Sequence, residues 1–206
     1  MTKKEEQYEA RRGQLLDIGL RHFIQYGFYG TSTRKIAEEA GISSGLMFHY
    51  YPNKLALYEA LVKIGCEAMS SSDSGECAPE ESSPLDYFEE KLDRFLSIML
   101  TNSFSSKMFI FMGLAAINAK EISKTAFEMI KEHDIISLSV PYIKKGQKAG
   151  LIRQGDPCTL ASVFYNSIQG FAEVLNTRND LKLPEKEWFM AILKNPEITD
   201  TASTQS

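Results

Sequence analysis

Residues 31–54 of the chain read TSTRKIAEEAGISSGLMFHYYPNK. The apolar side chains of Ile36 and Ala40 stand four residues apart, so they share one face of a first short helix that we expect to start near Thr33. Gly41 follows the last turn of that helix, where chains often take a left-handed backbone conformation that only glycine adopts without steric cost. The stretch therefore predicts two short helices joined by a tight turn at Gly41.

Side chains that can cap a helix precede each of the two predicted helices. Thr31 and Ser32 stand before the first helix, and their hydroxyl oxygens can accept hydrogen bonds from its free backbone N–H groups. Ser43 or Ser44 takes the same place before the second helix, which we expect over about residues 44–51. Both helices thus begin at a recognisable start signal.

The second helix divides its side chains between two faces. Met47 and Tyr51 are four residues apart and are expected to point inward, whereas Phe48 and His49 are expected to point outward. An exposed aromatic ring beside an exposed imidazole needs a partner surface, and Gly45 lets such a surface approach the backbone closely. This arrangement is typical of a helix-turn-helix, in which the second helix lies in the major groove of DNA.

Lys54 begins a further helix directly after Pro52 and Asn53. A cation at the start of a helix opposes the helix dipole, so an anion bound at the same place would be favourable. A DNA phosphate held by Lys54 and by free N–H groups of the helix start is the natural candidate. We therefore expect Lys54 to be a phosphate contact.

These features are part of a longer pattern. Its matching positions are Tyr26-Gly27-Phe28, Thr31-Ser32-Thr33, Ile36-Ala37, Ala40-Gly41-Ile42-Ser43, Gly45, the aromatic run 48–51, Lys54 and Leu57. From about residue 11 to residue 64 the sequence resembles the tetracycline-repressor-like (TetR) regulators. The resemblance implies an all-helical homodimer that binds operator DNA and usually leaves it when a small molecule binds.

The resemblance also implies which residues contact DNA. They are Thr33, Arg34, Ser44, Gly45, Leu46, Phe48, His49, Tyr50 and Lys54. Three of them depart from the family pattern: Phe48 lacks the hydroxyl of a common Tyr, Ser44 replaces a frequent Lys or Arg, and Leu46 replaces a frequent Thr or Ser. The departures fall on the helix that reads the bases.

Charge is distributed unevenly along the chain, whose formal net charge is −4 over 206 residues. Residues 1–64 hold nine Lys and Arg against seven Asp and Glu, whereas residues 65–206 hold fourteen against twenty. The positive end is the end expected to meet phosphates, although a difference of this size also arises by chance.

No apolar run reaches the roughly 20 residues of a membrane span, and the first residues lack the apolar stretch of a signal peptide. We expect a cytoplasmic protein with no membrane partner.

The remaining pattern predicts an all-α protein. We expect an N-terminal domain over 1–64 that holds a three-helix helix-turn-helix unit and a larger helical domain over 65–206, which the resemblance implies binds the effector and dimerises. Within the first domain we expect a charged tail over 1–10, a helix over 11–26 that ends at Gly27, and a helix from Lys54 to about Met69. A polar linker covers 70–83 and a disordered tail covers 195–206, while further helices are expected near 85–101, 104–119, 122–149, 157–177 and 185–194.

The larger domain carries many Met and Phe side chains, which tolerate irregular cavities well. The residues proposed to bind a small-molecule effector are Phe95, Met99, Phe104, Met108, Phe111, Met112, Asn118, Tyr165 and Asn166. The alternative interpretation is that the apolar side chains are ordinary core and that the polar ones are satisfied buried groups.

Two apolar stripes near the C-terminus are candidates for a dimer face, and the resemblance implies that they form a four-helix contact between two chains. Their residues are Ala161, Tyr165, Ile168, Phe171, Ala172, Leu175, Trp188, Phe189 and Ile192. Two-fold symmetry of such a dimer would match a palindromic operator. The alternative is that both stripes pack within one monomer.

Several other functions lack support in the sequence. Cys66, Cys77 and Cys158 have no Cys-x-x-Cys spacing and form no cluster with the three histidines, so we expect neither a metal site nor a disulfide framework. No phosphate loop and no Ser-His-Asp arrangement indicates an enzyme, and no cofactor is expected. The alternatives to a ligand-responsive repressor are a DNA-binding regulator without an inducer and an enzyme that uses the C-terminal cavity.

Overall fold

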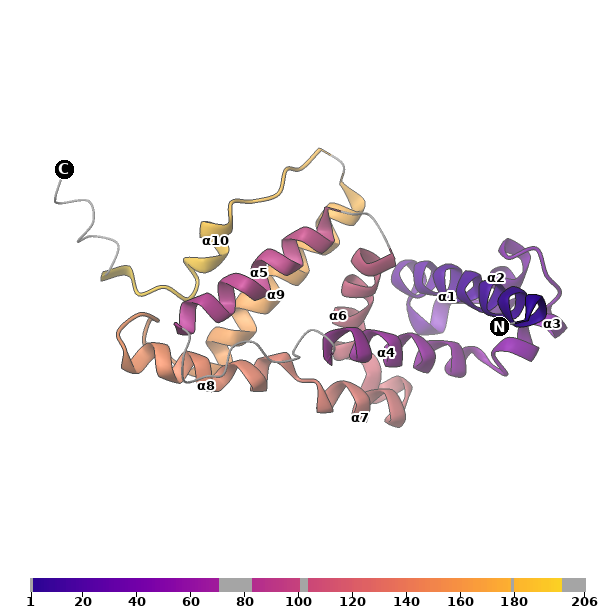
Figure 1. Ribbon diagram of the computed structural model, residues 1–206, viewed down its shortest axis with the longest axis horizontal. Coiled ribbons are helices and arrows are strands. Elements are labelled where there is room, and N and C mark those ends of the chain that lie inside the picture. The colour runs from indigo at the N-terminus through magenta and orange to yellow at the C-terminus, as the bar shows by residue number, and fades with distance from the viewer. Residues whose placement is uncertain (1, 71–82, 101–103, 179, 198–206) are drawn as a thin grey trace. The chain divides into compact units, whose positions relative to one another are not determined.

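The computed structural model describes residues 2–70, 83–100, 104–178 and 180–197 (Figure 1). These residues form helices and no strand, which confirms the predicted all-α fold. The helices are α1 (Lys3–Gly30), α2 (Thr33–Glu39), α3 (Ser44–Tyr50), α4 (Lys54–Ser70), α5 (Pro84–Met99), α6 (Phe104–Ile122), α7 (Lys124–Glu132), α8 (Ile135–Lys148), α9 (Pro157–Thr177) and α10 (Lys186–Met190). The predicted linker at 70–83 and tail at 195–206 lie largely outside the described residues.

Helix α1 begins much earlier than the sequence analysis predicted. It starts at Lys3, where a charged tail was expected, because Thr2 and Glu5 form a reciprocal capping box. The Thr2 N–H donates to Glu5 Oε2 at 2.8 Å, and the Glu5 N–H donates to Thr2 Oγ1 at 3.3 Å. The predicted break at Gly27 is confirmed, since this residue has a φ of +66° and interrupts the helical backbone.

The helix-turn-helix forms where it was predicted. Gly41 has a φ of +68°, and the backbone N–H of Ile42 donates to the carbonyl of Ala37 at 3.0 Å, which closes the corner between α2 and α3. The predicted caps differ between the two helices. Ser43 caps α3 by accepting a hydrogen bond from the Leu46 N–H at 3.2 Å, whereas Ser32 makes no side-chain cap on α2.

The chain divides into two compact units that do not follow a boundary at residue 64. The first unit contains α1 to α4 together with α6 and α7, and the second contains α5 and α8 to α10. In the first unit α6 packs on α1 and α4, and α7 packs on α4 and α6. The buried side chains of Phe23, Tyr58 and Phe111 join these helices, with ring centroids 5.4 to 6.2 Å apart. The core under the helix-turn-helix therefore includes residues far along the chain.

The second unit is held by α8 and α9, with α5 and α10 packed beside them. Its core includes the fully buried Phe88, Ile143 and Phe164. The helix predicted over 122–149 is two helices, because Ser123 caps α7 and Asp134 caps α8 with their side chains. The last predicted helix is also shorter than expected. Only Lys186–Met190 is helical, and the following turn leads into an isolated bridge between Ile152 and Lys194.

Across the described ranges no single helix is long and apolar enough to cross a membrane. Helices α5 and α6 match a span in length and composition only when they are taken together.

Candidate nucleic-acid interface

Helix α3 presents an apolar and aromatic face to solvent. Leu46 and Phe48 are 43% and 45% exposed, and Ser44, Gly45 and His49 are exposed as well. On the opposite side Met47 and Tyr51 are buried, so the predicted division of faces is confirmed. Single exposed apolar side chains are common, but two on one short helix beside an open glycine form a surface suited to contact with a partner.

Cations next to this face come from α2 rather than α3. Arg34 and Lys35 are exposed, and the Arg34 guanidinium lies 3.8 Å from the carboxylate of Glu38 on the same helix. An exposed pair of this kind contributes little to stability, so Arg34 is free to exchange Glu38 for a phosphate. Thr33 is half-buried at the first position of α2.

Lys54 has partners inside the protein. Its Nζ donates to the carbonyl oxygens of Thr31 at 3.0 Å and Tyr29 at 3.4 Å, and it lies 4.6 Å from the centroid of the Phe28 ring. Burial lowers the pKa of Lys54. The side chain thereby joins the start of α4 to the connection between α1 and α2, a role that the sequence analysis did not foresee.

Helix α2 is fixed to α1 by a group of charged side chains. Glu39 accepts from Arg21 at 2.7 Å, and its second carboxylate oxygen lies 2.9 Å from Nε2 of His22. The hydrogen bond from His22, followed by that from Arg21, lowers the pKa of Glu39. Arg21 also contacts Asp17 at 3.3 Å, and Asp17 in turn contacts Lys107 of α6 at 3.5 Å. These contacts connect α2 through α1 to α6.

Sequence reasoning missed a second set of contacts, which comes from the first turns of α1. Arg11 Nη1 donates to the carbonyl of Ala40 at 3.0 Å, at the end of α2. The Arg12 guanidinium lies 6.0 Å from the centroid of the Tyr51 ring, directly after α3. The ring of Tyr8 lies 4.8 Å from that of Tyr50. The signal that could have revealed this region is the capping-box pattern Thr2-x-x-Glu5, which starts α1 early enough for Tyr8 to be helical.

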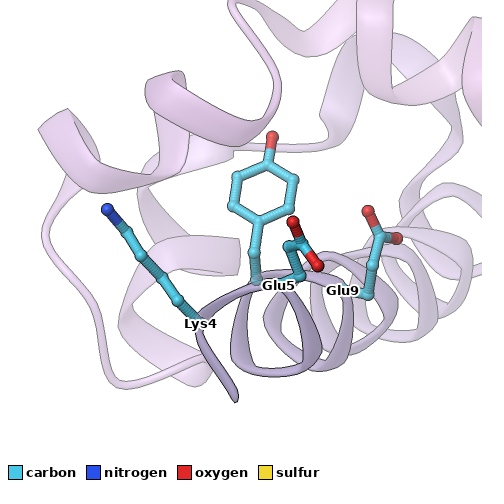
Figure 2. Close-up of a pocket in the computed structure, with 4 residues that line it drawn as sticks. Lys4, Glu5 and Glu9 are labelled. Carbon is cyan, nitrogen blue, oxygen red and sulfur yellow. The ribbon is translucent and has the colours of Figure 1, made fainter. Parts of the chain in front are cut away.

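A surface pocket also lies on the first turns of α1. Its described lining residues are Lys4, Glu5, Tyr8 and Glu9. Figure 2 shows Lys4 extending away from the two carboxylates. Because the described lining comes from one helix and combines both signs of charge, the pocket has no donor set suited to a particular ligand.

The nine predicted ligand-binding residues have different surroundings. In the first unit Met108 and Phe111 are core residues of α6, Phe104 and Met112 are packed against that core, and Asn118 is exposed with its amide bonded to the carbonyl of Leu114. In the second unit Phe95 and Met99 are half-buried on α5, and Asn166 is exposed on α9. Tyr165 is a satisfied buried polar group, because its hydroxyl lies 2.8 Å from Oγ of Ser139.

A pocket of about 290 Å³ lies within the first unit, where the end of α1 meets α4 and α6. Its floor is aromatic, formed by the buried rings of Phe23, Tyr58 and Phe111, and Asn118 also lines it. Burial raises the pKa of Tyr58 to about 12, so its hydroxyl stays protonated at neutral pH. The pocket also borders the segment from Gly27 to Tyr29, which leads to the carbonyl groups that bind Lys54.

The predicted dimer stripe is largely covered within the single chain. Its buried members are Ala161, Tyr165, Ile168, Ala172 and Phe189. This agrees with the alternative interpretation, in which these side chains pack inside one monomer. A different row of α9 faces solvent, since Val163 is 50% exposed and Asn166, Gly170 and Val174 are exposed at helical spacing. Trp188 of α10 is 65% exposed.

Thiol and metal chemistry find little support in the described part of the chain. Cys66 is buried, and burial raises the pKa of its thiol to about 11. Cys158 is exposed on α9, and Cys77 lies outside the described residues. Among the residues described, no group of three His, Cys, Asp or Glu side chains is placed to hold a metal ion.

Comparison with known sequences connects this surface to one family. The family model described as "Bacterial regulatory proteins, tetR family" matches residues 15–61. The HTH-type transcriptional regulator RutR of Escherichia coli (strain K12) is 26% identical over 173 residues, which are 83% of this chain and 78% of the relative. The HTH-type transcriptional repressor Rv1474c of Mycobacterium tuberculosis is 36% identical over 72 residues, which are 35% of this chain and 38% of the relative.

Solved structures share the fold. AibR in complex with isovaleryl coenzyme A and operator DNA matches with a TM-score of 0.64 and 18% identity, over 88% of this chain and 94% of that one. The ketosteroid transcriptional regulator KstR2 of Mycobacterium tuberculosis matches with a TM-score of 0.65 and 18% identity, over 89% and 95%. At this level of identity the likeness concerns the fold alone.

Proposed function

Because the chain belongs to the TetR family of bacterial regulatory proteins, we propose that it is a repressor that binds palindromic operator DNA as a homodimer and leaves it when a small molecule binds. The observation that carries this proposal is the outward face of α3, where Gly45 lies open between Leu46 and Phe48. The relatives are transcriptional regulators rather than enzymes, which agrees with the expectation that this chain is not an enzyme. One relative, Rv1474c, is a transcriptional repressor, and one structural neighbour, AibR, was solved in complex with operator DNA.

The nine residues predicted from sequence remain our proposed DNA contacts, with a changed role for Lys54. Its ammonium is already bonded to Thr31 and Tyr29, so contact with a phosphate requires it to share or exchange these carbonyl partners. Arg34, exposed and weakly paired, is the better placed cation. Base recognition then rests on short contacts from α3, whose side chains are apolar, aromatic or small.

The test uses DNA selected from a pool of random duplexes by the full-length parent protein. Gly45→Ala should raise the free energy of unfolding by up to about 1 kcal/mol, because Ala favours the helix and the only contact of a new Cβ is with the Ser43 hydroxyl at 4.0 Å. The same methyl group should weaken binding to the selected duplex by about tenfold or more, since a closely approaching partner must move away from it.

Gly13→Ala is the matched control. It lies in α1 with no atom within 4 Å of a new Cβ, so it should give a similar gain in stability with unchanged DNA affinity. A parent protein that enriches no sequence from the pool contradicts the proposed function. If the Gly45→Ala and Gly13→Ala variants bind the selected duplex with equal affinity, α3 is not part of the DNA interface.

We place the proposed effector site in the aromatic pocket of the first unit. Two of the predicted ligand-binding residues, Phe111 and Asn118, line it, and it borders the segment that binds Lys54. A molecule bound there would lie next to the segment that binds Lys54, so it could directly shift the start of α4. The structural neighbour solved with isovaleryl coenzyme A supports the proposal of a small-molecule effector.

The effector test compares two variants of α6. Asn118→Trp should block the mouth of the pocket, so a compound that releases the parent protein from the selected duplex should no longer do so. Ile117→Trp is the control, because Ile117 is exposed on the same helix and does not line the pocket. If the compound releases the Asn118→Trp variant from the selected duplex at the same concentration as the parent protein, the effector site lies elsewhere.

For the homodimer we propose the solvent-facing row of α9 in place of its buried stripe. Val163, Gly170 and Val174 lie along this row, and the small Gly170 permits close approach of a second helix. The exposed ring of Trp188 adds an apolar side chain of the kind enriched at protein interfaces.

A further inference from the structure

We propose that the first turns of α1 contribute to DNA binding by positioning α3. Tyr8 is the positioning residue, and it fixes the C-terminal end of α3. The inference rests on the proposed function, because it assumes that α3 binds DNA. It assigns a role to a segment that lies before residues 15–61, the part matched by the family model.

Three aromatic rings lie together where α1 meets the end of α3. The centroid of Tyr8 lies 4.8 Å from that of Tyr50, with the ring planes 31° apart, and 6.1 Å from that of His49, with the planes at 87°. His49 and Tyr50 are themselves 5.7 Å apart at 78°. These are the separations and angles at which aromatic rings attract one another. Tyr8 therefore holds the two residues at the end of α3 from the side of α1.

Helix α3 depends on such support because it is short and few of its own side chains are buried. It has seven residues, and Met47 is its only buried side chain. A helix of two turns is not stable by itself and takes its orientation from its tertiary contacts. Met47 fixes the middle of α3 and the buried Tyr51 fixes the residue after its last turn, while the contact of Tyr8 with residues 49 and 50 holds the same end of the helix from the side of α1.

The position of Tyr8 is itself well determined. The capping box of Thr2 and Glu5 begins α1 one full turn before Tyr8. Arg11 and Arg12, three and four residues further on, lie on the same helix face and contact Ala40 and Tyr51. One row of α1 thus touches the end of α2, the end of α3 and the residue after α3.

The chemistry of this segment favours positioning over direct contact with phosphate. Glu6 and Glu9 are the charged residues nearest to Tyr8 in sequence, and their carboxylates repel phosphate, whereas the cations Lys4 and Arg11 lie about a turn away on either side. Figure 2 shows Glu5 and Glu9 beside each other, with Lys4 apart from them. Tyr8 is 37% exposed, so its removal opens no cavity in the core. The loss should therefore appear mainly in the orientation of α3.

The experiment compares Tyr8→Ala, Tyr8→Phe and the control Gln7→Ala in the full-length chain. Gln7 is exposed on the neighbouring position of the same turn and has no ring contact. The probes are a duplex that the parent protein selects from a random pool and an unrelated duplex of the same length. Tyr8→Ala should weaken binding to the selected duplex by about tenfold, with a change of less than about twofold on the unrelated one.

Two further results are expected if the role is positioning. The salt dependence of binding should keep the parent's slope, because no phosphate contact is lost. Tyr8→Phe should restore parent affinity, since it keeps the ring, and Gln7→Ala should never lose it. Equal weakening on both duplexes, a reduced salt slope, or an unchanged Tyr8→Ala variant overturns the proposal.

Proton NMR of the imidazole groups tests the ring contact without DNA. The chain has three histidines, so the His49 signal can be assigned with a single His49→Gln variant. Tyr8→Ala should shift the His49 ring protons by removing a nearby aromatic ring, whereas Tyr8→Phe should leave them near the parent positions. An unshifted signal refutes the contact. A parent protein that selects no duplex refutes the proposed function instead, and the NMR result still decides whether Tyr8 holds α3.

Discussion

At the turn between α2 and α3, a single residue determines the backbone path. Gly41 has a φ of +68° and no atom within 4 Å of a Cβ built on it, so any cost of a side chain there comes from the backbone alone. Gly41→Ala should lower the free energy of unfolding by roughly 1–2 kcal/mol, the cost of a left-handed conformation for an L-residue. Urea denaturation at constant m-value measures the change.

Gly13 provides the contrast for this measurement. Its Cβ would also meet nothing within 4 Å, but its backbone is helical, so Gly13→Ala should be stabilising by up to about 1 kcal/mol. Opposite signs for the two substitutions are the expected outcome. A Gly41→Ala variant as stable as the parent protein would contradict the cost assigned to the positive φ, and a destabilised Gly13→Ala variant would contradict the helical preference assigned to position 13.

Residues whose roles depend on near neighbours in sequence could be predicted. Gly41, Ser43 and the inward pair Met47 and Tyr51 follow from helix geometry and capping over a few positions. Lys54 could not be predicted in the same way. Its carbonyl partner Thr31 lies 23 residues away, and only the folded arrangement of α1 and α4 brings the two together.

Among the helices, α9 shows that an apolar pattern does not identify the surface that covers it. Its predicted bounds, 157–177, are confirmed, and several members of its apolar stripe are buried within the second unit, where α8 and α10 pack on α9, whereas Phe171 and Leu175 are half-buried. Periodicity reports that a face is buried without saying which chain buries it. Breaks inside a periodic pattern are also hard to predict, and the cap at Asp134 that separates α7 from α8 has no strong signal in the apolar spacing.

The solvent-facing row of α9 leads to a prediction about assembly. Val163→Arg and Val174→Arg should convert a dimer into monomers, because an unpaired charge buried in a contact between subunits costs several kcal/mol. Leu138→Arg is the control, since Leu138 is equally exposed at 50% but belongs to α8. Sedimentation velocity distinguishes the two states. Monomers from the Leu138→Arg variant, or dimers from both Val variants, would place the interface elsewhere.

The first unit of the molecule is discontinuous in sequence. Helices α6 and α7 complete the core that α1 and α4 begin, although α5 of the second unit lies between them in the chain. The boundary at residue 64 marks the end of a sequence pattern, and the functional division into 1–64 and 65–206 stays a proposal. Contacts between α1 and α6 join residues about 90 positions apart, as in the pair of Lys107 and Asp17.

A truncation tests this arrangement. A fragment of residues 1–72 retains the helix-turn-helix but lacks α6 and α7, so Phe23 and Tyr58 lose their packing against Phe111. It should melt without a cooperative transition, since it leaves large apolar side chains uncovered. A fragment of residues 1–133 should recover cooperative melting, as followed by circular dichroism. A cooperative transition in the shorter fragment would mean that the first four helices form a domain by themselves.

The same return of α6 and α7 sets an order of events during synthesis. When α4 has left the ribosome, the helices that will cover α1 and α4 have not yet been made. At roughly 5–20 residues per second, the interval until α7 emerges lasts on the order of several seconds. Through that interval the nascent helix-turn-helix has an apolar side without a partner. A translational pause after α4 would lengthen this exposure, whereas a pause after α7 would come once the first unit is complete.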